Sequence, residues 1–237
     1  MNKLILTTAA FALTAGMSFA DTVRMGTEGA YKPYNYINDD GELDGFEIHL
    51  GDELCKRAGL TCEWVKNDWD SIIPNLVSGN YDTIIAGMSI TDERDEVIDF
   101  TDPYTQPDPS AYMALSADVN LDGAVIAAQT NTIQSGFVAA SGGTLIEFAT
   151  ADETVAAVRS GEADAVLADL NYLLPIVDAE AGLVLLAQQE MIGGGVGMGI
   201  RESDGELRAK FNIAIQSMKA DGSLNALIAE WGVGEKF

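Results

Sequence analysis

The stretch YDTIIAGMSITDER, residues 81–94, decides the fold class. Its first part, from Tyr81 to Gly87, is a mainly apolar run that ends in glycine, which is typical of a buried parallel strand. Thr91 and the acids after it are typical of a helix start, because acidic side chains favour the positive end of the helix dipole. A buried strand followed by a helix is the repeating unit of α/β folds.

The same alternation continues on both sides of this stretch. Toward the N-terminus we expect strands at 22–27 and 62–66, a loop rich in Gly, Tyr, Pro and Asn up to residue 45, and helices at 46–58 and 70–78. Toward the C-terminus we expect strands near 125–128, 145–148 and 163–168, and helices near 134–140, 152–160, 170–177, 204–220 and 224–231. This order predicts mainly parallel sheets covered by helices on both faces.

Two breaks interrupt the alternation. One is the Pro-rich stretch 102–109, and the other is the glycine run 193–199. No Lys-Ser or Lys-Thr pair follows the glycines, so a phosphate-binding loop is not indicated. A hinge that tolerates changes in φ and ψ is the better interpretation. Between the breaks, residues 110–193 hold Arg159 as their single basic residue, which also favours a separate α/β lobe.

Composition excludes several classes of function. The 237 residues include 37 acids and 13 Lys or Arg, which gives a formal net charge of −24. Binding to nucleic acid needs a basic stripe, and adsorption to an anionic membrane needs clustered basic residues. With 47% hydrophobic residues the chain is also unlike a disordered acidic tail. A very acidic globular protein is expected.

The first twenty residues have the pattern of a secretory signal peptide. Lys3 precedes an apolar stretch from Leu4 to Met17, and a small-x-small sequence ends at Ala20. A membrane anchor is the alternative, but the stretch is short and Thr and Gly interrupt it. We therefore expect cleavage after Ala20 and export to the periplasm. The residue directly after the cleavage site is Asp21, so no cysteine stands there to accept a lipid.

The two cysteines fit an exported protein. Cys55 falls late in the helix expected at 46–58, and Cys62 begins the next strand. An oxidising compartment permits a disulfide between them. Metal binding is the alternative, but two cysteines without a nearby histidine make a poor zinc site. We predict the Cys55–Cys62 disulfide and no metal.

Ordered motifs give the chain a resemblance to a known family. They are VRMGTEGAYKPY (23–34), GFEI (45–48), DWDSIIPNL (68–76), AGMSITDER (86–94), VIDFT (97–101), SGEADA (160–165), and the ending from DGS (221–223) to WG (231–232). In this order they resemble bacterial solute-binding proteins of family 3, periplasmic receptors that deliver polar amino acids and opines to ABC importers. The cysteine pair resembles the disulfide of the family's receptors for basic amino acids.

The resemblance implies a type II periplasmic-binding-protein fold. Two α/β lobes, each a mainly parallel sheet flanked by helices, would be joined by two hinge strands with the ligand between them. Lobe 1 would comprise residues 21–109 and 194–237, and lobe 2 residues 110–193. These limits coincide with the two breaks found from composition.

A buried amino acid needs a partner for each of its charges. For the carboxylate we expect Arg94, whose planar guanidinium can hold both oxygens, together with Ser89 after the strand. The resemblance assigns both residues this role. The alternative for Arg94 is pairing with Asp92 or Glu93 on a solvated helix.

For the ammonium we expect Asp169 from the second lobe, with the carbonyl of Gly87 as a further acceptor. The resemblance assigns this role to Asp169, and the alternative is an ordinary helix N-cap, because a helix follows it. Thr132 is expected to meet the carboxylate through its N–H. The family usually has glycine where this chain has Thr130, so that role could fall to Asn131 instead.

The remaining predicted residues surround the ligand's side chain. Tyr31 and Trp69 would form its aromatic walls, although filling of the core is an alternative for both. Glu28 would pair with a distal cation, as in the family's arginine, lysine and opine receptors. Glutamine, histidine and an opine remain alternative ligands.

The expected function is lobe closure around a polar amino acid, for which a cationic side chain is favoured, and its delivery to a membrane permease. We expect a monomer that uses no cofactor, catalyses nothing, and meets the inner membrane only through that permease. The alternative is an enzyme on the same scaffold, resembling the periplasmic cyclohexadienyl or arogenate dehydratases. An anionic prephenate would then face both Glu28 and Asp169.

Overall fold

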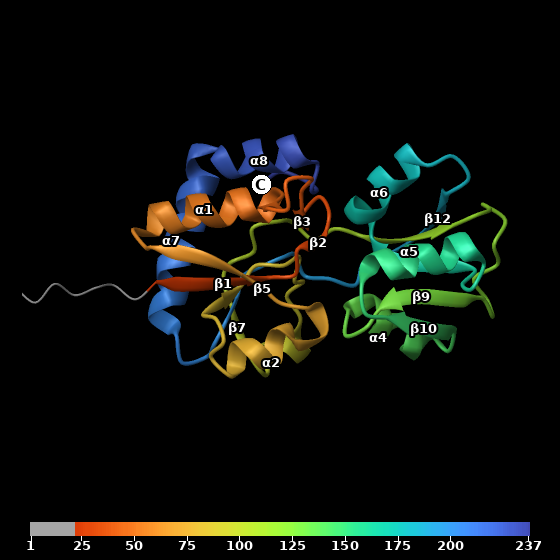
Figure 1. Ribbon diagram of the computed structural model, residues 1–237, viewed down its shortest axis with the longest axis horizontal. Helices are drawn as coiled ribbons and strands as arrows, with labels where there is room; N and C mark the ends of the chain where they lie inside the picture. The colour runs from red at the N-terminus through yellow and green to blue at the C-terminus, as the bar shows by residue number, and fades with distance from the viewer. Residues whose placement is uncertain (1–21) are drawn as a thin grey trace, which may run out of the picture.

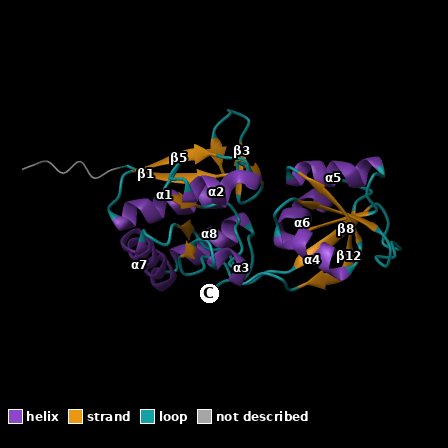
Figure 2. Cartoon of the chain, turned by 90° about the horizontal axis from the view of Figure 1, so that it is seen from below, coloured by secondary structure: helices purple, strands orange, loops and turns teal. Residues whose placement is uncertain are grey.

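The computed structural model of the protein describes residues 22–237, and the predicted signal peptide with its cleavage site lies outside these residues. Two lobes lie side by side, each with a sheet between helices (Figures 1 and 2). Between residues 22 and 237, no helix combines the length and apolar character that a membrane crossing requires. The expected two-lobed α/β architecture is confirmed.

The sheet of the first lobe has the order β5-β1-β6-β13-β7. Its strands are β1 (Val23–Thr27), β5 (Cys62–Lys66), β6 (Thr83–Ile84), β7 (Asp99–Phe100) and β13 (Gly199–Ile200). Strand β1 pairs in parallel with β5 and β6, whereas β13 is antiparallel to both β6 and β7. One strand therefore opposes the other four.

Helices cover both faces of this sheet. Their bounds are α1 (Phe46–Ala58), the 3-10 helix Trp69–Ser71 continued by α2 (Ile72–Val77), α3 (Asp92–Asp95), α7 (Gly205–Asp221) and α8 (Ser223–Trp231). Ile85 belongs to the core cluster that includes residues of α1 and α7, whereas its neighbour Ile84 packs with α2 on the other face. Because successive residues point to opposite faces, a strand covered on both sides is apolar throughout.

The second lobe repeats this plan with the order β10-β9-β11-β8-β12. Its strands are β8 (Ser110–Ala114), β9 (Val125–Gln129), β10 (Thr144–Phe148), β11 (Ala165–Asp169) and β12 (Val184–Glu190), and its helices are α4 (Ile133–Ser141), α5 (Ala151–Ser160) and α6 (Leu170–Ala179). Strands β9, β10 and β11 pair in parallel, and β8 is the opposed strand.

The chain passes between the lobes twice. The first crossing segment, residues 101–109, leads from β7 to β8, and the second, residues 191–198, leads from β12 to β13. The N–H of Tyr104 donates to the carbonyl of Val196 at 2.8 Å, and the N–H of Val196 donates to Thr105 Oγ1 at 3.1 Å. The two crossing segments are thus hydrogen-bonded to each other.

Gly195 belongs to the glycine run 193–199, which was expected to form a hinge. Its φ is +93°, and a Cβ at this position would lie 2.8 Å from the carbonyl oxygen of Thr105. Glycine is therefore required here for the left-handed backbone and for the close approach of the two crossing segments.

Some expected elements differ from the structure. The segment expected to be a loop up to residue 45 contains a three-stranded antiparallel sheet of β2 (Ala30–Tyr31), β3 (Asn35–Ile37) and β4 (Leu43–Asp44). The strand expected over 81–87 is regular only at β6. Strands β7, β8, β12 and β13 were not predicted. Every antiparallel pair of the two large sheets includes β8 or β13.

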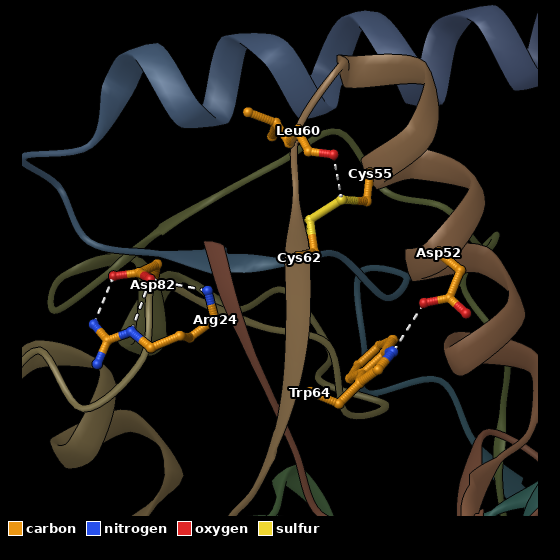
Figure 3. Close-up of a disulfide and its surroundings, with 7 residues drawn as sticks. All are labelled: Arg24, Asp52, Cys55, Leu60, Cys62, Trp64 and Asp82. Atoms are coloured by element: carbon orange, nitrogen blue, oxygen red, sulfur yellow. Dashed lines mark hydrogen bonds and ion pairs between the residues drawn. A yellow bond between two sulfur atoms is a disulfide. The ribbon is translucent and has the colours of Figure 1, made fainter. Parts of the chain in front are cut away.

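The predicted disulfide is present (Figure 3). It joins Cys55 near the end of α1 to Cys62, the first residue of β5, with the two Cα atoms 6.3 Å apart. In β1, Val23 is opposite Cys62 and Thr27 is opposite Lys66. The disulfide therefore lies at the opposite end of the sheet from the residues that follow Thr27.

Candidate functional site

A cavity lies between the two lobes, with about 330 Å³ of space not occupied by protein atoms. It is lined by all eight ligand-binding residues named in the sequence analysis, Glu28, Tyr31, Trp69, Gly87, Ser89, Arg94, Thr132 and Asp169, and by Ala86, Gln129, Ile133 and Gln134. The structure therefore brings the predicted site residues together.

Strand ends bring these residues to the cavity. Glu28 follows β1, Gly87 and Ser89 follow β6, and Gln129 and Asp169 are the last residues of β9 and β11. Within each lobe these strands are parallel to each other, β1 to β6 and β9 to β11, so their carboxyl ends share one edge. Ligands of α/β sheets bind outside this edge, and here the two edges face each other.

Arg94 is held in the cavity wall by the single-turn helix α3. Its Nη1 donates to the carbonyl of Ser89 at 2.8 Å, and its Nη2 donates to the carbonyl of Asn131, across the cavity, at 3.3 Å. Within residues 22–237 no ion pair joins Arg94 to Asp92 or Glu93, the alternative considered from sequence. Burial lowers the pKa of Arg94 to about 10, so the guanidinium stays charged at neutral pH.

The side chain of Asp169 does not cap α6, although the residue occupies the N-cap position. Its Oδ2 accepts from the hydroxyl of Tyr31 at 2.7 Å, and its Oδ1 accepts from Gln134 Nε2 at 2.8 Å. Burial raises the pKa of Asp169. The carboxylate is thus oriented from both lobes, toward the cavity instead of the helix.

Tyr31 lines the cavity as expected and also contacts the second lobe. Its ring stacks on Tyr172 of the second lobe, with centres 4.5 Å apart and planes 7° from parallel, while its hydroxyl bonds Asp169. A Cβ on Gly87, whose φ is +62°, would lie 3.4 Å from the Tyr31 ring. The ring therefore fits closely between the backbone at Gly87 and the second lobe.

Glu28 meets the second lobe through Gln129. Gln129 Nε2 donates to Glu28 Oε1 at 2.7 Å and to the carbonyl of Ala149 at 3.1 Å. Burial raises the pKa of Glu28 from its ordinary value of 4.5 to about 7, and the carboxylates of Asp68 and Asp152 contribute to the rise. The Glu28 carboxyl therefore gains or loses its proton near neutral pH.

The loop before α4 contains Asn131 and Thr132, the two residues considered for the contact with the carboxylate. Asn131, not Thr130, has a positive φ, of 56°. Thr132 is the N-cap of α4, and its Oγ1 accepts from the N–H of Ser135 at 3.1 Å. The first N–H groups of a helix have no partner within the helix, and those of α4 begin at the cavity wall.

Trp69 begins the 3-10 helix and forms another wall of the cavity. The guanidinium carbon of Arg94 lies 5.4 Å from the centre of its ring, a cation–π contact. Its buried indole N–H has no hydrogen-bond partner among the described residues. Trp69 thus serves both the cavity and a core cluster, because it also packs with residues of α2.

Sequence reasoning missed Gln129 and Gln134. Gln129 could have been found, because it ends an apolar run just as Asp169 does, and strand ends carry ligand-binding residues. Gln134 carries no comparable signal. It lies inside a helix, and its contacts with Asp169 and Ser110, at 2.8 and 2.9 Å, depend on how the sheet is assembled.

Comparison with known proteins gives one consistent result. Residues 23–234 match the family model for bacterial extracellular solute-binding proteins, family 3. The chain is 32% identical to the histidine-binding periplasmic protein of Escherichia coli K12, over 98% of this chain and 97% of that protein. It is also 32% identical to the octopine-binding periplasmic protein of Rhizobium meliloti, over 94% and 95% of the two chains.

A solved structure is more similar still. It is a periplasmic His/Glu/Gln/Arg/opine family-binding protein from Silicibacter pomeroyi in complex with lysine. The two chains are 70% identical, the match covers 89% of this chain and 96% of that one, and the TM-score is 0.87.

Proposed function

Because the chain belongs to the bacterial extracellular solute-binding proteins of family 3, we propose that it binds a cationic amino acid between its lobes and delivers it to an ABC importer. The similarity to periplasmic binding proteins for histidine and octopine, and to a lysine-bound structure, confirms the predicted class. The choice of a cationic ligand goes beyond that class.

The distribution of charge around the cavity carries this choice. Arg94 offers a guanidinium to the ligand's carboxylate, and α4 in the other lobe turns its N-terminus toward the same cavity. Asp169, in the same lobe as α4, faces Arg94 from across the cavity as a partner for the α-ammonium. Glu28 then remains as a second, buried carboxyl. Only an amino acid with a cationic side chain would supply a charge to pair with it.

Closure would couple binding to transport. Contacts from Arg94 in one lobe and Asp169 in the other stabilise the closed arrangement, because the ligand pairs with both lobes at once. We propose that the lobes follow the predicted limits, with residues 110–193 moving against 21–109 and 194–237. The crossing segments 101–109 and 191–198 would serve as the hinge.

The relatives named above are periplasmic binding proteins, and this supports the predictions about export and partners. We propose export with cleavage after Ala20, a monomeric receptor, and docking of the closed form on a membrane permease. We also propose that the chain catalyses nothing, because these relatives are binding proteins. The dehydratase alternative is less supported, and incubation with prephenate or arogenate should yield no phenylpyruvate or phenylalanine.

Calorimetry with a set of matched ligands tests the proposal. L-Lysine should bind, and L-norleucine, which lacks the distal ammonium, should bind at least about tenfold more weakly. Cadaverine lacks the carboxylate and N-α-acetyl-lysine lacks the α-ammonium, so both should fail to bind. Norleucine binding as tightly as lysine would refute a cationic ligand, and binding of glutamate alone would refute the role of Glu28.

A further inference from the structure

Glu47 is a completely buried carboxylate that does not line the cavity. It is the second residue of α1, its exposed fraction is 0%, and it belongs to the GFEI motif to which no function was assigned. Burial raises its pKa, and its hydrogen bonds oppose that rise. Burying a charge away from water is unfavourable in free energy unless hydrogen-bond donors compensate for the lost solvation. Its three partners therefore need an explanation.

Two of these partners belong to cavity loops. The N–H of Gly87, a cavity residue, donates to Glu47 Oε1 at 2.6 Å. Asn35 Nδ2 donates to Glu47 Oε2 at 2.7 Å, and Asn35 Oδ1 accepts from the N–H of Gly29 at 2.7 Å. Gly29 directly follows Glu28. The carboxylate thus holds the Gly87 loop directly and the Glu28 loop through one amide.

The third partner belongs to the first crossing segment. The hydroxyl of Tyr104 donates to Glu47 Oε1, and the N–H of Tyr104 donates to Val196 in the second crossing segment at 2.8 Å. Val196 in turn forms a β-bridge with the cavity residue Ser89. The same carboxylate therefore reaches both cavity loops and both crossing segments.

We propose that Glu47 is a positioning residue of the binding site, whose buried carboxylate fixes the Glu28 and Gly87 loops to each other and to the crossing segments. The inference rests on the proposed function for its ligand and adds a residue to that site. Glu47 acts through Asn35, Gly87 and Tyr104 and does not touch the ligand itself.

The direction of these hydrogen bonds makes the proposal specific. Three donors converge on Glu47, so neither oxygen can be replaced by an N–H₂ group without opposing a donor. If Asn35 turned its amide over to accept from a glutamine at position 47, its own N–H₂ would then face the N–H of Gly29. Glu47→Gln therefore transmits the mismatch to the loop that carries Glu28, although it preserves shape and removes a buried charge.

The experiment compares Glu47→Gln with Thr83→Val as a control. Thr83 is equally buried in the same lobe, and its hydroxyl donates to the carbonyl of Gly199 at 3.0 Å, away from the cavity loops. Lysine affinity from calorimetry should fall about tenfold or more in Glu47→Gln. It should stay within twofold of wild type in Thr83→Val, whatever each variant loses in melting temperature. If the two variants lost the same affinity, Glu47 would contribute only to folding stability, and the proposal would be wrong.

A second readout does not depend on any ligand. In the absence of amino acids, hydrogen exchange at the Gly29 and Gly87 amides should be faster in Glu47→Gln than in wild type or Thr83→Val, and unchanged exchange would overturn the proposal. If the wild type bound no amino acid, the proposed function would fail, and this readout would still decide the role of Glu47. Should Glu47→Gln not fold, Tyr104→Phe replaces it, with faster exchange at Gly87 supporting the proposal and wild-type exchange overturning it.

Discussion

The hydroxyl of Tyr31 donates to Asp169 Oδ2 at 2.7 Å, and this hydrogen bond joins the two lobes across the cavity. The bond ends on the residue proposed to hold the α-ammonium of the ligand. Because a carboxylate accepts several hydrogen bonds, Tyr31 can orient Asp169 and leave acceptor capacity for the ammonium. Closure and ligand binding therefore share one side chain.

Tyr31→Phe should favour the open form. The variant keeps the stack on Tyr172 but loses the polar contact that joins the lobes. We expect a larger radius of gyration in small-angle X-ray scattering without amino acids, and a wild-type value with saturating lysine. Tyr112→Phe is the control, because the Tyr112 hydroxyl contacts Glu190 within the second lobe. The same expansion in both variants would contradict a role in closure.

Asp169→Asn should separate binding from stability. Removing one member of a buried charge pair costs about 2–5 kcal/mol of binding energy, so lysine affinity should fall by more than about thirtyfold. Because burial raises the pKa of Asp169, its charge is unfavourable in the fold, and the melting temperature without ligand should not fall. Asp178→Asn, on the exposed side of α6, should change neither quantity. Wild-type affinity in Asp169→Asn would refute the site.

Glu28 predicts two opposite pH trends. Its pKa is about 7 in the fold and 4.5 ordinarily, so the unfolded chain releases this proton more readily. Stability without ligand should therefore fall as pH rises from about 4.5 to about 7. Lysine affinity should rise toward pH 8, because a distal cation needs the ionised carboxylate. Calorimetry near pH 7 in buffers of different ionisation enthalpy should detect proton release on binding.

Glu28→Gln should remove the rise in affinity and the proton release. Glu42→Gln is the control, because Glu42 lies exposed in the turn before β4. A pH profile that is the same in wild type and Glu28→Gln would show that another group is titrating.

The predictions from sequence succeeded where the signal was local and continuous. The bounds of α1, β5 and the elements from β9 to α6 follow apolar runs and glycine stops, so they could be predicted to within a few residues. Strands β2, β3 and β4 are two or three residues long, too short to show a period. The order of strands in the sheet could not be predicted either, because β13 lies between β6 and β7, which come much earlier in the chain.

The site shows the same division. Arg94, Asp169 and Glu28 were predicted because their motifs resemble those of a family, and all three line the cavity. Glu28 and Asp169 also stand at strand ends, where ligands of α/β sheets bind. The contacts that give them their chemistry were not predictable. Gln134 reaches Asp169 because α4 packs beside β11 within the second lobe. Gln129 reaches Glu28 because the two sheets face each other across the cavity.

Removing the disulfide should lower stability and leave binding unchanged. A link between residues seven positions apart removes about 2.5 kcal/mol of unfolded-chain entropy in the loop-closure model. The double variant Cys55→Ser/Cys62→Ser should therefore melt several degrees lower. Lysine affinity should be unaffected, because Cys62 lies at the end of β5 opposite the cavity. A reductant should lower the melting temperature of the wild type but not that of the double variant.

Gly195→Ala should destabilise the contact between the crossing segments. A methyl group would lie 2.8 Å from the carbonyl oxygen of Thr105, on a backbone with φ of +93°. We expect a loss of about 2–4 kcal/mol in the free energy of unfolding, measured in urea. Gly205→Ala is the matched control, because a Cβ there meets nothing within 4 Å. Equal stability of the two variants would show that the crossing segments tolerate separation.

The position of β13 has a consequence for biosynthesis. This strand lies between β6 and β7, yet all the strands of the second lobe precede it in the chain. As the ribosome proceeds from the N-terminus, the second sheet is complete at Glu190, while the first still lacks an inner strand. The lobe whose synthesis begins first is thus the last that can finish folding, and no truncation before Ile200 leaves it whole.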